Sequence, residues 1–221
     1  MTLLALSLLP WVAAAVVACL RADSRHGVSW VAGAAALGVA ALALHLAPPV
    51  FAGEVLVWSV PWLPALGIDF GFRMDGLAWL FTLLIGGIGA LVVLYAAWYL
   101  DPKDPARRFF VFLLLFMGAM LGVVLADNLV LLVVFWELTS LSSFLLIGYW
   151  HARDDAREGA RMALAVTGAG GLCLLAGVLL VHQARAVQLE RQRPLAIGFL
   201  GQQHAPHVGV FDDAHLRLAA V

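Results

Sequence analysis

The chain has 221 residues, of which 63% are hydrophobic and 12% charged, and its mean hydropathy is +0.96. Soluble domains are rarely so apolar, and a net charge of −1 gives no basic surface for nucleic acid. Because no Walker, GxGxxG or catalytic-triad motif occurs, we expect no cofactor, no metal site and no soluble-enzyme chemistry. The composition therefore predicts an all-α membrane protein whose surroundings are the lipid bilayer.

Six apolar segments have the length of membrane-spanning helices, which need about 20 residues each. The predicted spans cover residues 2–20, 28–47, 77–100, 109–126, 129–150 and 162–181. Pro48 and Pro49 are expected to end the second span. Between the second and third spans, two β-like runs at residues 54–60 and 68–74 flank the loop PWLPALG and predict a small extracytoplasmic β-hairpin.

Lysine and arginine are distributed unevenly between the predicted loops. Loops one, three and five hold Arg21, Arg25, Lys103, Arg107, Arg108, Arg153, Arg157 and Arg161, while loops two and four hold only Arg73. Cytoplasmic loops are enriched in basic residues, so we expect loops one, three and five in the cytoplasm. The N-terminus and the hairpin of this multi-pass membrane protein then lie outside.

Glu137 lies near the middle of the fifth predicted span, LVLLVVFWELTSLSSFLLIGYW. A carboxylate there costs about 2.5–3.5 kcal/mol on insertion scales, so we expect it to face other helices or water. The two-residue connection before this span makes the fourth and fifth spans antiparallel neighbours. We therefore expect Glu137 near the face with Met117, Gly118, Met120 or Gly122. The alternative is a purely structural acid satisfied by a partner.

Four hydroxyl residues follow Glu137, namely Thr139, Ser140, Ser142 and Ser143, and three of them are candidates for a supporting role. The three candidates are Thr139, Ser140 and Ser143, and Ser140 at position i+3 shares the helix face of Glu137. Their hydroxyl groups would either hold a proton-carrying water or join neighbouring transmembrane helices.

Three further candidates lie closer to the ends of the spans. Asp127 belongs either to a helix-capping turn or to an entrance for ions. His151, about 21 Å along the helix from Glu137, marks either the cytoplasmic boundary or a water-linked proton entry. Arg161 either extends to the membrane interface or acts as a temporary counter-charge for Glu137.

Five stretches of the chain carry recognisable motifs. They are FAGEVL (51–56), PWLPALG (61–67), FRMDGLA (72–78), LLFMGAMLGVVLADN (114–128) and VVFWELTSLSSFLLIGYW (133–150). Together they resemble the A subunits of Mrp-type multisubunit monovalent-cation/proton antiporters, which are themselves similar to the antiporter-like subunits of respiratory complex I. The resemblance implies a Na⁺(K⁺)/H⁺ antiporter subunit that works with other subunits of the complex on protons and monovalent cations. It also implies proton translocation through Glu137, paired with a lysine on a later, broken helix.

The chain departs from this pattern after its sixth predicted span. Its only lysine is Lys103, in a predicted cytoplasmic loop, and no broken helix follows. Residues 182–221 are polar and rich in His and Gln, and they predict an irregular or disordered tail. We interpret this tail as an out-of-frame or truncated reading of a longer gene, with a short subunit completed by another chain as the alternative. A proton-pumping subunit of a complex I-like NADH dehydrogenase and an inactive fragment are the alternative functions.

Overall fold

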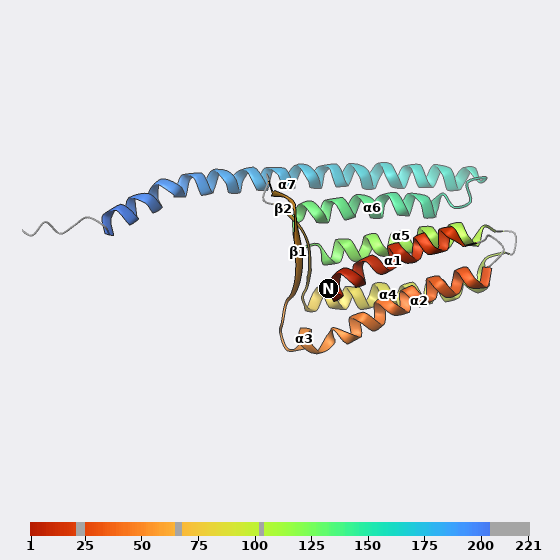
Figure 1. Cartoon of the computed structure of the whole chain (residues 1–221). Helices are drawn as coiled ribbons and strands as arrows, with labels where there is room; N and C mark the ends of the chain where they lie inside the picture. The colour runs from red at the N-terminus through yellow and green to blue at the C-terminus, as the bar shows by residue number, and fades with distance from the viewer. Residues whose placement is uncertain (21–24, 65–67, 102–103, 204–221) are drawn as a thin grey trace, which may run out of the picture. The chain divides into compact units, whose positions relative to one another are not determined.

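The computed structural model describes residues 1–20, 25–64, 68–101 and 104–203 (Figure 1). Its elements in chain order are α1 (Thr2–Cys19), α2 (Arg25–His45), α3 (Ala47–Phe51), β1 (Leu56–Leu63), β2 (Ile68–Met74), α4 (Gly76–Tyr99), α5 (Ala106–Leu125), α6 (Leu129–Ile147) and α7 (Asp154–Gln203). The chain divides into two compact units, Met1–Val178 and Leu179–Val221. Within the described residues, six helices are long and apolar enough to cross a membrane: α1, α2, α4, α5, α6 and the Asp154–Val181 part of α7. The predicted multi-pass helical fold with its small hairpin is confirmed.

Proline positions explain two differences from the predicted boundaries. Pro48 and Pro49 lie in the short helix α3, immediately after α2 ends at His45. A first helical turn accepts proline because its N–H groups have no partner within the helix. Strand β1 continues through Pro61, which is opposite Asp69 at an irregularity in the ladder. Edge strands and bulges tolerate proline because the N–H group that proline lacks is not needed for the ladder at those positions.

The C-terminal segment also differs from the prediction. Helix α7 continues to Gln203, so the tail predicted to be irregular is helical over residues 182–203, while residues 204–221 lie outside the described residues. The prediction was wrong there because the lack of an apolar run excludes a membrane span but not a helix. The segment is rich in Ala, Leu, Gln and Arg, which are strong helix formers.

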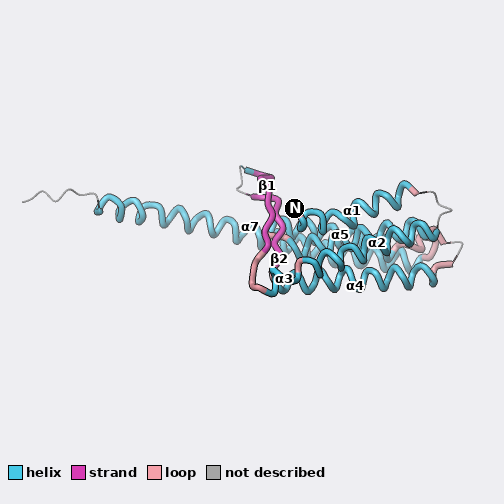
Figure 2. Tube along the Cα trace, turned by 60° about the horizontal axis from the view of Figure 1, so that its bottom comes forward, coloured by secondary structure: helices cyan, strands magenta, loops and turns pink. Residues whose placement is uncertain are grey.

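Within Met1–Val178, the hairpin crosses the ends of the helices beside the N-terminus (Figures 1 and 2). The start of α5 and the α6–α7 connection lie at the opposite end of the bundle (Figure 1). Helix α1 packs against α2 and α5, α2 against α4, and α5 against α6. The described loops that are rich in basic residues therefore lie at one end of the bundle. The hairpin, with Arg73, lies at the other end.

Glycine allows the closest approaches between these helices. A Cβ atom on Gly86 of α4 would lie 2.8 Å from the backbone nitrogen of Ala40 on α2. On α5, the position that a Cβ of Gly122 would take is occupied by the ring of Phe135 on α6. Small residues at helix interfaces are typical of membrane bundles, where close van der Waals contact replaces the hydrophobic effect.

Replacing Gly122 with alanine should destabilise the α5–α6 contact. The added methyl group would overlap the Phe135 ring at Cγ, an atom that moves only with the Phe135 side chain as a whole. Overpacking of this kind costs about 1–3 kcal/mol, so we expect a lower thermal unfolding temperature for the detergent-solubilised protein. Gly87→Ala on α4 is the matched control, because its Cβ would have no described atom within 4 Å. Equal unfolding temperatures for both variants would contradict the described packing.

Candidate functional site

Glu137 lies on α6 with its side chain half-buried. Its Oε1 atom is enclosed and has no hydrogen-bond partner among the described residues. Burying an ionised carboxylate without a partner is costly, and proteins reduce that cost by protonation or by bringing a cation close. Among the described residues, nothing supplies such a partner to Oε1 of Glu137.

The carboxyl group of Glu137 lies against Gly171 on α7. A Cβ atom built on Gly171 would overlap Oε1 of Glu137 and lie 2.8 Å from its Cδ. The same two helices meet again further along, where a Cβ on Gly148 would lie 3.5 Å from Cβ of Ala160. These contacts define an antiparallel α6–α7 seam, and Figure 1 shows the two helices side by side.

The expectation that Glu137 faces α5 is wrong. Phe135, not Glu137, meets Gly122 of α5, while Gly118 meets Trp11 of α1 and Met117 meets Gly89 of α4. Residues two positions apart in an α-helix point about 200° from each other. Because Phe135 faces α5, Glu137 points away from α5 and toward α7. The short connection correctly predicted which helices are neighbours, but not which face of α6 they share.

The hydroxyl groups after Glu137 are engaged within their own helix. Thr139 and Ser140 donate hydrogen bonds to the carbonyl oxygen of Trp136, at 2.6 and 3.2 Å. Ser142, the fourth of these hydroxyl residues, donates to the carbonyl of Leu138 at 2.7 Å. Ser143 is half-buried on the same helix. Such bonds leave the hydroxyl oxygens free only as acceptors, so a supporting role near Glu137 stays a prediction.

The hairpin is joined to the start of α6 by hydrogen bonds. Asp127 donates its backbone N–H to the carbonyl of Gly71 at 3.1 Å, and its own side chain is exposed. Asn128 caps α6 by accepting from the N–H of Leu131 at 2.9 Å, and its Nδ2 donates to the carbonyl of Asp69 at 2.7 Å. The capping turn is therefore present, with Asn128 as the cap. An ion entrance at Asp127 stays a prediction.

His151 and Arg161 lie at the end of the bundle away from the hairpin. Arg108 of α5 donates to Nδ1 of His151 at 3.3 Å, since a guanidinium has no acceptor. Arg161 is exposed and donates to the carbonyl of Arg157 at 3.3 Å. Ten residues separate Arg161 from Gly171, or about 15 Å along α7, so the structure does not bring Arg161 to the Glu137 carboxyl group. Lys103 lies outside the described residues.

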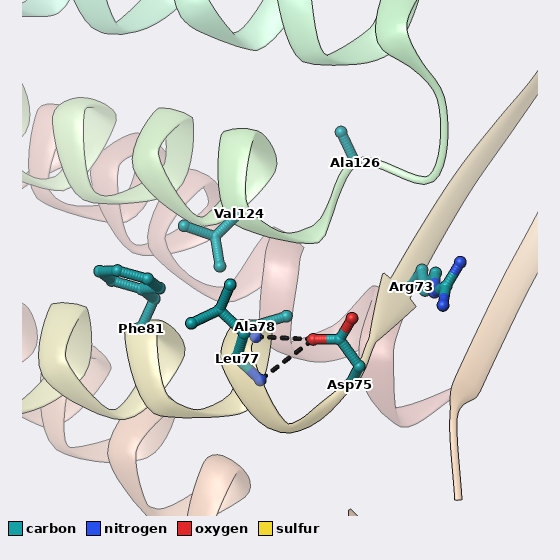
Figure 3. Close-up of a pocket in the computed structure, with 7 residues that line it drawn as sticks. All are labelled: Arg73, Asp75, Leu77, Ala78, Phe81, Val124 and Ala126. Atoms are coloured by element: carbon teal, nitrogen blue, oxygen red, sulfur yellow. Dashed lines mark hydrogen bonds between the residues drawn. The ribbon is translucent and has the colours of Figure 1, made fainter.

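A separate cavity of about 300 Å³ lies where the hairpin meets α4 and α5 (Figure 3). It is lined by Arg73, Asp75, Leu77, Ala78, Phe81, Val124 and Ala126. Asp75 accepts from the N–H groups of Leu77 and Ala78 at 3.1 and 3.0 Å and caps α4. None of the candidate residues around Glu137 lines this cavity.

The α6–α7 seam can be tested by cross-linking. Paired cysteines at Gly148 and Ala160 should form a disulfide on mild oxidation, because the 3.5 Å between the two Cβ positions matches disulfide geometry. Cys19 and Cys173 are free and exposed, so both are first replaced by serine. Mass spectrometry of the linked peptide gives the yield. The control pair, Gly148→Cys with Gly168→Cys, places the second thiol about 12 Å further along α7 and should not link. Equal yields for the two pairs would exclude this seam.

Two family models match adjacent parts of the chain. Residues 62–110 match the family described as NADH-ubiquinone oxidoreductase (complex I), chain 5 N-terminus. Residues 126–195, which include Glu137 and Gly171, match the family described as NADH:quinone oxidoreductase/Mrp antiporter, TM.

Curated relatives are similar at high identity. The chain is 51% identical over 174 residues to the A/B subunit of a probable K(+)/H(+) antiporter of Rhizobium meliloti, covering 79% of this chain and 17% of that protein. It is 52% identical over 131 residues to the A subunit of the Na(+)/H(+) antiporter of Alkalihalophilus pseudofirmus, covering 59% of this chain and 16% of that protein. The chain thus spans about a sixth of the length of these relatives.

Two solved structures are also similar to this chain. A chain of the Mrp complex from a Dietzia species matches with a TM-score of 0.64 and 38% identity, over 77% of this chain and 18% of that chain. A chain of the membrane-bound sulfane sulfur reductase, an archaeal respiratory membrane complex, matches with a TM-score of 0.72 over 84% of this chain and 28% of that chain. At 18% identity the second match shows a shared fold alone. The chain is therefore similar to the A subunits of Mrp-type cation/proton antiporters, as its motifs predicted.

Proposed function

We propose that the chain acts in a membrane subunit of a multisubunit Na⁺(K⁺)/H⁺ antiporter and takes part in proton translocation through Glu137. One observation carries the proposal: Glu137 is the only Asp, Glu, Lys or Arg within the six predicted spans, and its Oε1 is enclosed without a hydrogen-bond partner among the described residues. Ionisable groups inside membrane spans are costly and typically mark proton or ion pathways.

The proposed chemistry follows from the surroundings of this carboxyl group. Its Oε1 atom is enclosed where α6 meets Gly171 of α7, so a charge that enters this site comes directly beside the carboxyl group. Arrival of a monovalent cation, or of a basic side chain that the cation displaces, would release the proton. Departure of that charge would let the carboxyl group take up a proton again, so the two ions are coupled at one site.

Other subunits of the complex are the proposed partners. Within the described residues, 11% of the apolar window of α7 is buried, against 28% for α6 and 44% for α5. Most of the α7 surface is therefore left for lipid or for neighbouring subunits. The basic residues of the odd-numbered loops support a bacterial inner-membrane location with the N-terminus and hairpin outside.

A complex I-like proton-pumping subunit is the second candidate. It is favoured by the match of residues 62–110 to a family described from complex I. In that case the same carboxyl group would move protons in response to quinone chemistry elsewhere, and Na⁺ would not be required.

Removing the carboxyl group should abolish transport. The chain is expressed with the other antiporter subunits in a sodium-sensitive host lacking the native subunit, and Na⁺-dependent proton flux is measured in everted vesicles. We expect Glu137→Gln to lower the flux by about 100-fold or more, as expected for a group that transfers the proton itself. Glu137→Asp keeps a carboxyl group and should retain part of the flux.

Three results would contradict the proposal. Equal flux for the Glu137→Gln variant would exclude the role of this residue. Flux that depends on NADH and quinone but not on Na⁺ would favour the complex I-like subunit. Absence of flux from a chain shown to be inserted and assembled would indicate an inactive fragment.

A further inference from the structure

The space that a side chain at position 171 would fill is taken by the carboxyl group of Glu137. We propose that Gly171 is a positioning residue for Glu137, which holds the carboxyl group against the uncovered backbone of α7. A Cβ atom at Gly171 would overlap Oε1 and lie 2.8 Å from Cδ and 3.5 Å from Oε2. The Oε1 atom thus occupies the position of the missing methyl group, with the rest of the carboxyl group beside it. The contact itself is independent of the proposed function, and only its consequence for transport rests on that function.

Four other glycines of the same helix, those whose surroundings the structure describes, have no comparable neighbour. A Cβ atom on Gly168, Gly170 or Gly177 would meet no described atom within 4 Å, and one on Gly159 would make an ordinary 3.9 Å contact with Ile147. Glycine inside a helix costs about 1 kcal/mol relative to alanine. At Gly171 the cost is offset by room for the carboxyl group, so its role differs from that of a generic small residue at a helix interface.

The neighbour of Gly171 is also the movable end of a long side chain. Where a backbone or a ring occupies the Cβ position, as at Gly86 and Gly122, an added methyl group forces helices apart. At Gly171 the methyl group would instead displace the Glu137 carboxyl group by rotation about its side-chain bonds. Alanine at position 171 is therefore expected to move the acid while leaving the fold intact.

The test compares the reactivity of Glu137 toward N,N′-dicyclohexylcarbodiimide, an apolar reagent that modifies carboxylic acids within membranes. The full chain is purified in detergent, and modification of the Glu137 peptide is followed by mass spectrometry. We expect Gly171→Ala to change the labelling rate several-fold without lowering the thermal unfolding temperature. Gly170→Ala, one residue away and facing open space, is the matched control and should label like the natural chain.

A shorter acid at position 137 should remove the effect of Gly171→Ala on labelling. Glu137→Asp ends one methylene earlier, so Gly171→Ala should change labelling little in that background, giving non-additive effects in a double-mutant cycle. Equal labelling of the natural chain and Gly171→Ala would overturn the proposal, as would equal effects of Gly170→Ala. Unfolding of Gly171→Ala would also overturn it, because the glycine would then be required for helix packing.

The vesicle transport assay distinguishes a failure of this inference from a failure of the proposed function. In the vesicle assay, Gly171→Ala should reduce Na⁺-dependent proton flux several-fold, and Glu137→Asp with Gly171→Ala should recover flux to the level of Glu137→Asp alone. Changed labelling with unchanged flux would confirm the contact but contradict proton transfer through Glu137. Reduced flux with unchanged labelling would overturn the positioning role of Gly171.

Discussion

A carboxyl group in a membrane span has to be covered on every side that would otherwise face lipid, and this requirement organises the centre of the structure. Helix α6 meets it by presenting different faces to different neighbours. Phe135 packs on Gly122 of α5, and Glu137 packs on Gly171 of α7. The acid is thus enclosed by the helix that contributes least buried surface in the described part of the chain, which makes the α6–α7 seam decisive for its environment.

The two ends of the bundle hold α6 in place by different means. At the hairpin end, Asn128 and the backbone of Asp127 bind carbonyl groups of β2, so the start of α6 is fixed by neutral hydrogen bonds. At the other end, Arg107 donates to the carbonyl of Leu20 at 3.1 Å and Arg108 to His151. Arg107 thus places a cation at the C-terminus of α1, which is favourable for the dipole of α1, and the two arginines connect α5 to its neighbours. These basic residues therefore contribute to packing between the helices.

Sequence reasoning predicted what depends on local chemistry. Apolar length predicted the six spans, and alternation predicted the hairpin. It did not predict that Glu137 meets Gly171, because hydropathy shows that a residue is covered but not which helix covers it. The glycine cluster of α7 was visible in the sequence, yet only the three-dimensional register distinguishes Gly171 from Gly170. The continuation of α7 past Val181 was missed because a test for membrane spans says nothing about polar helices.

Glycine therefore has two physical roles in this bundle. Lipid offers little hydrophobic drive for helix association, so packing depends on how closely helices approach. At Gly86 and Gly122 the neighbour is a backbone or an aromatic ring, and the contact fixes the distance between two helices. At Gly171 the neighbour is a carboxyl group on a flexible stem, and the contact fixes only where that group rests. A side chain in such a place can change position while its helices stay still, which is the property that a proton carrier inside a rigid membrane bundle requires.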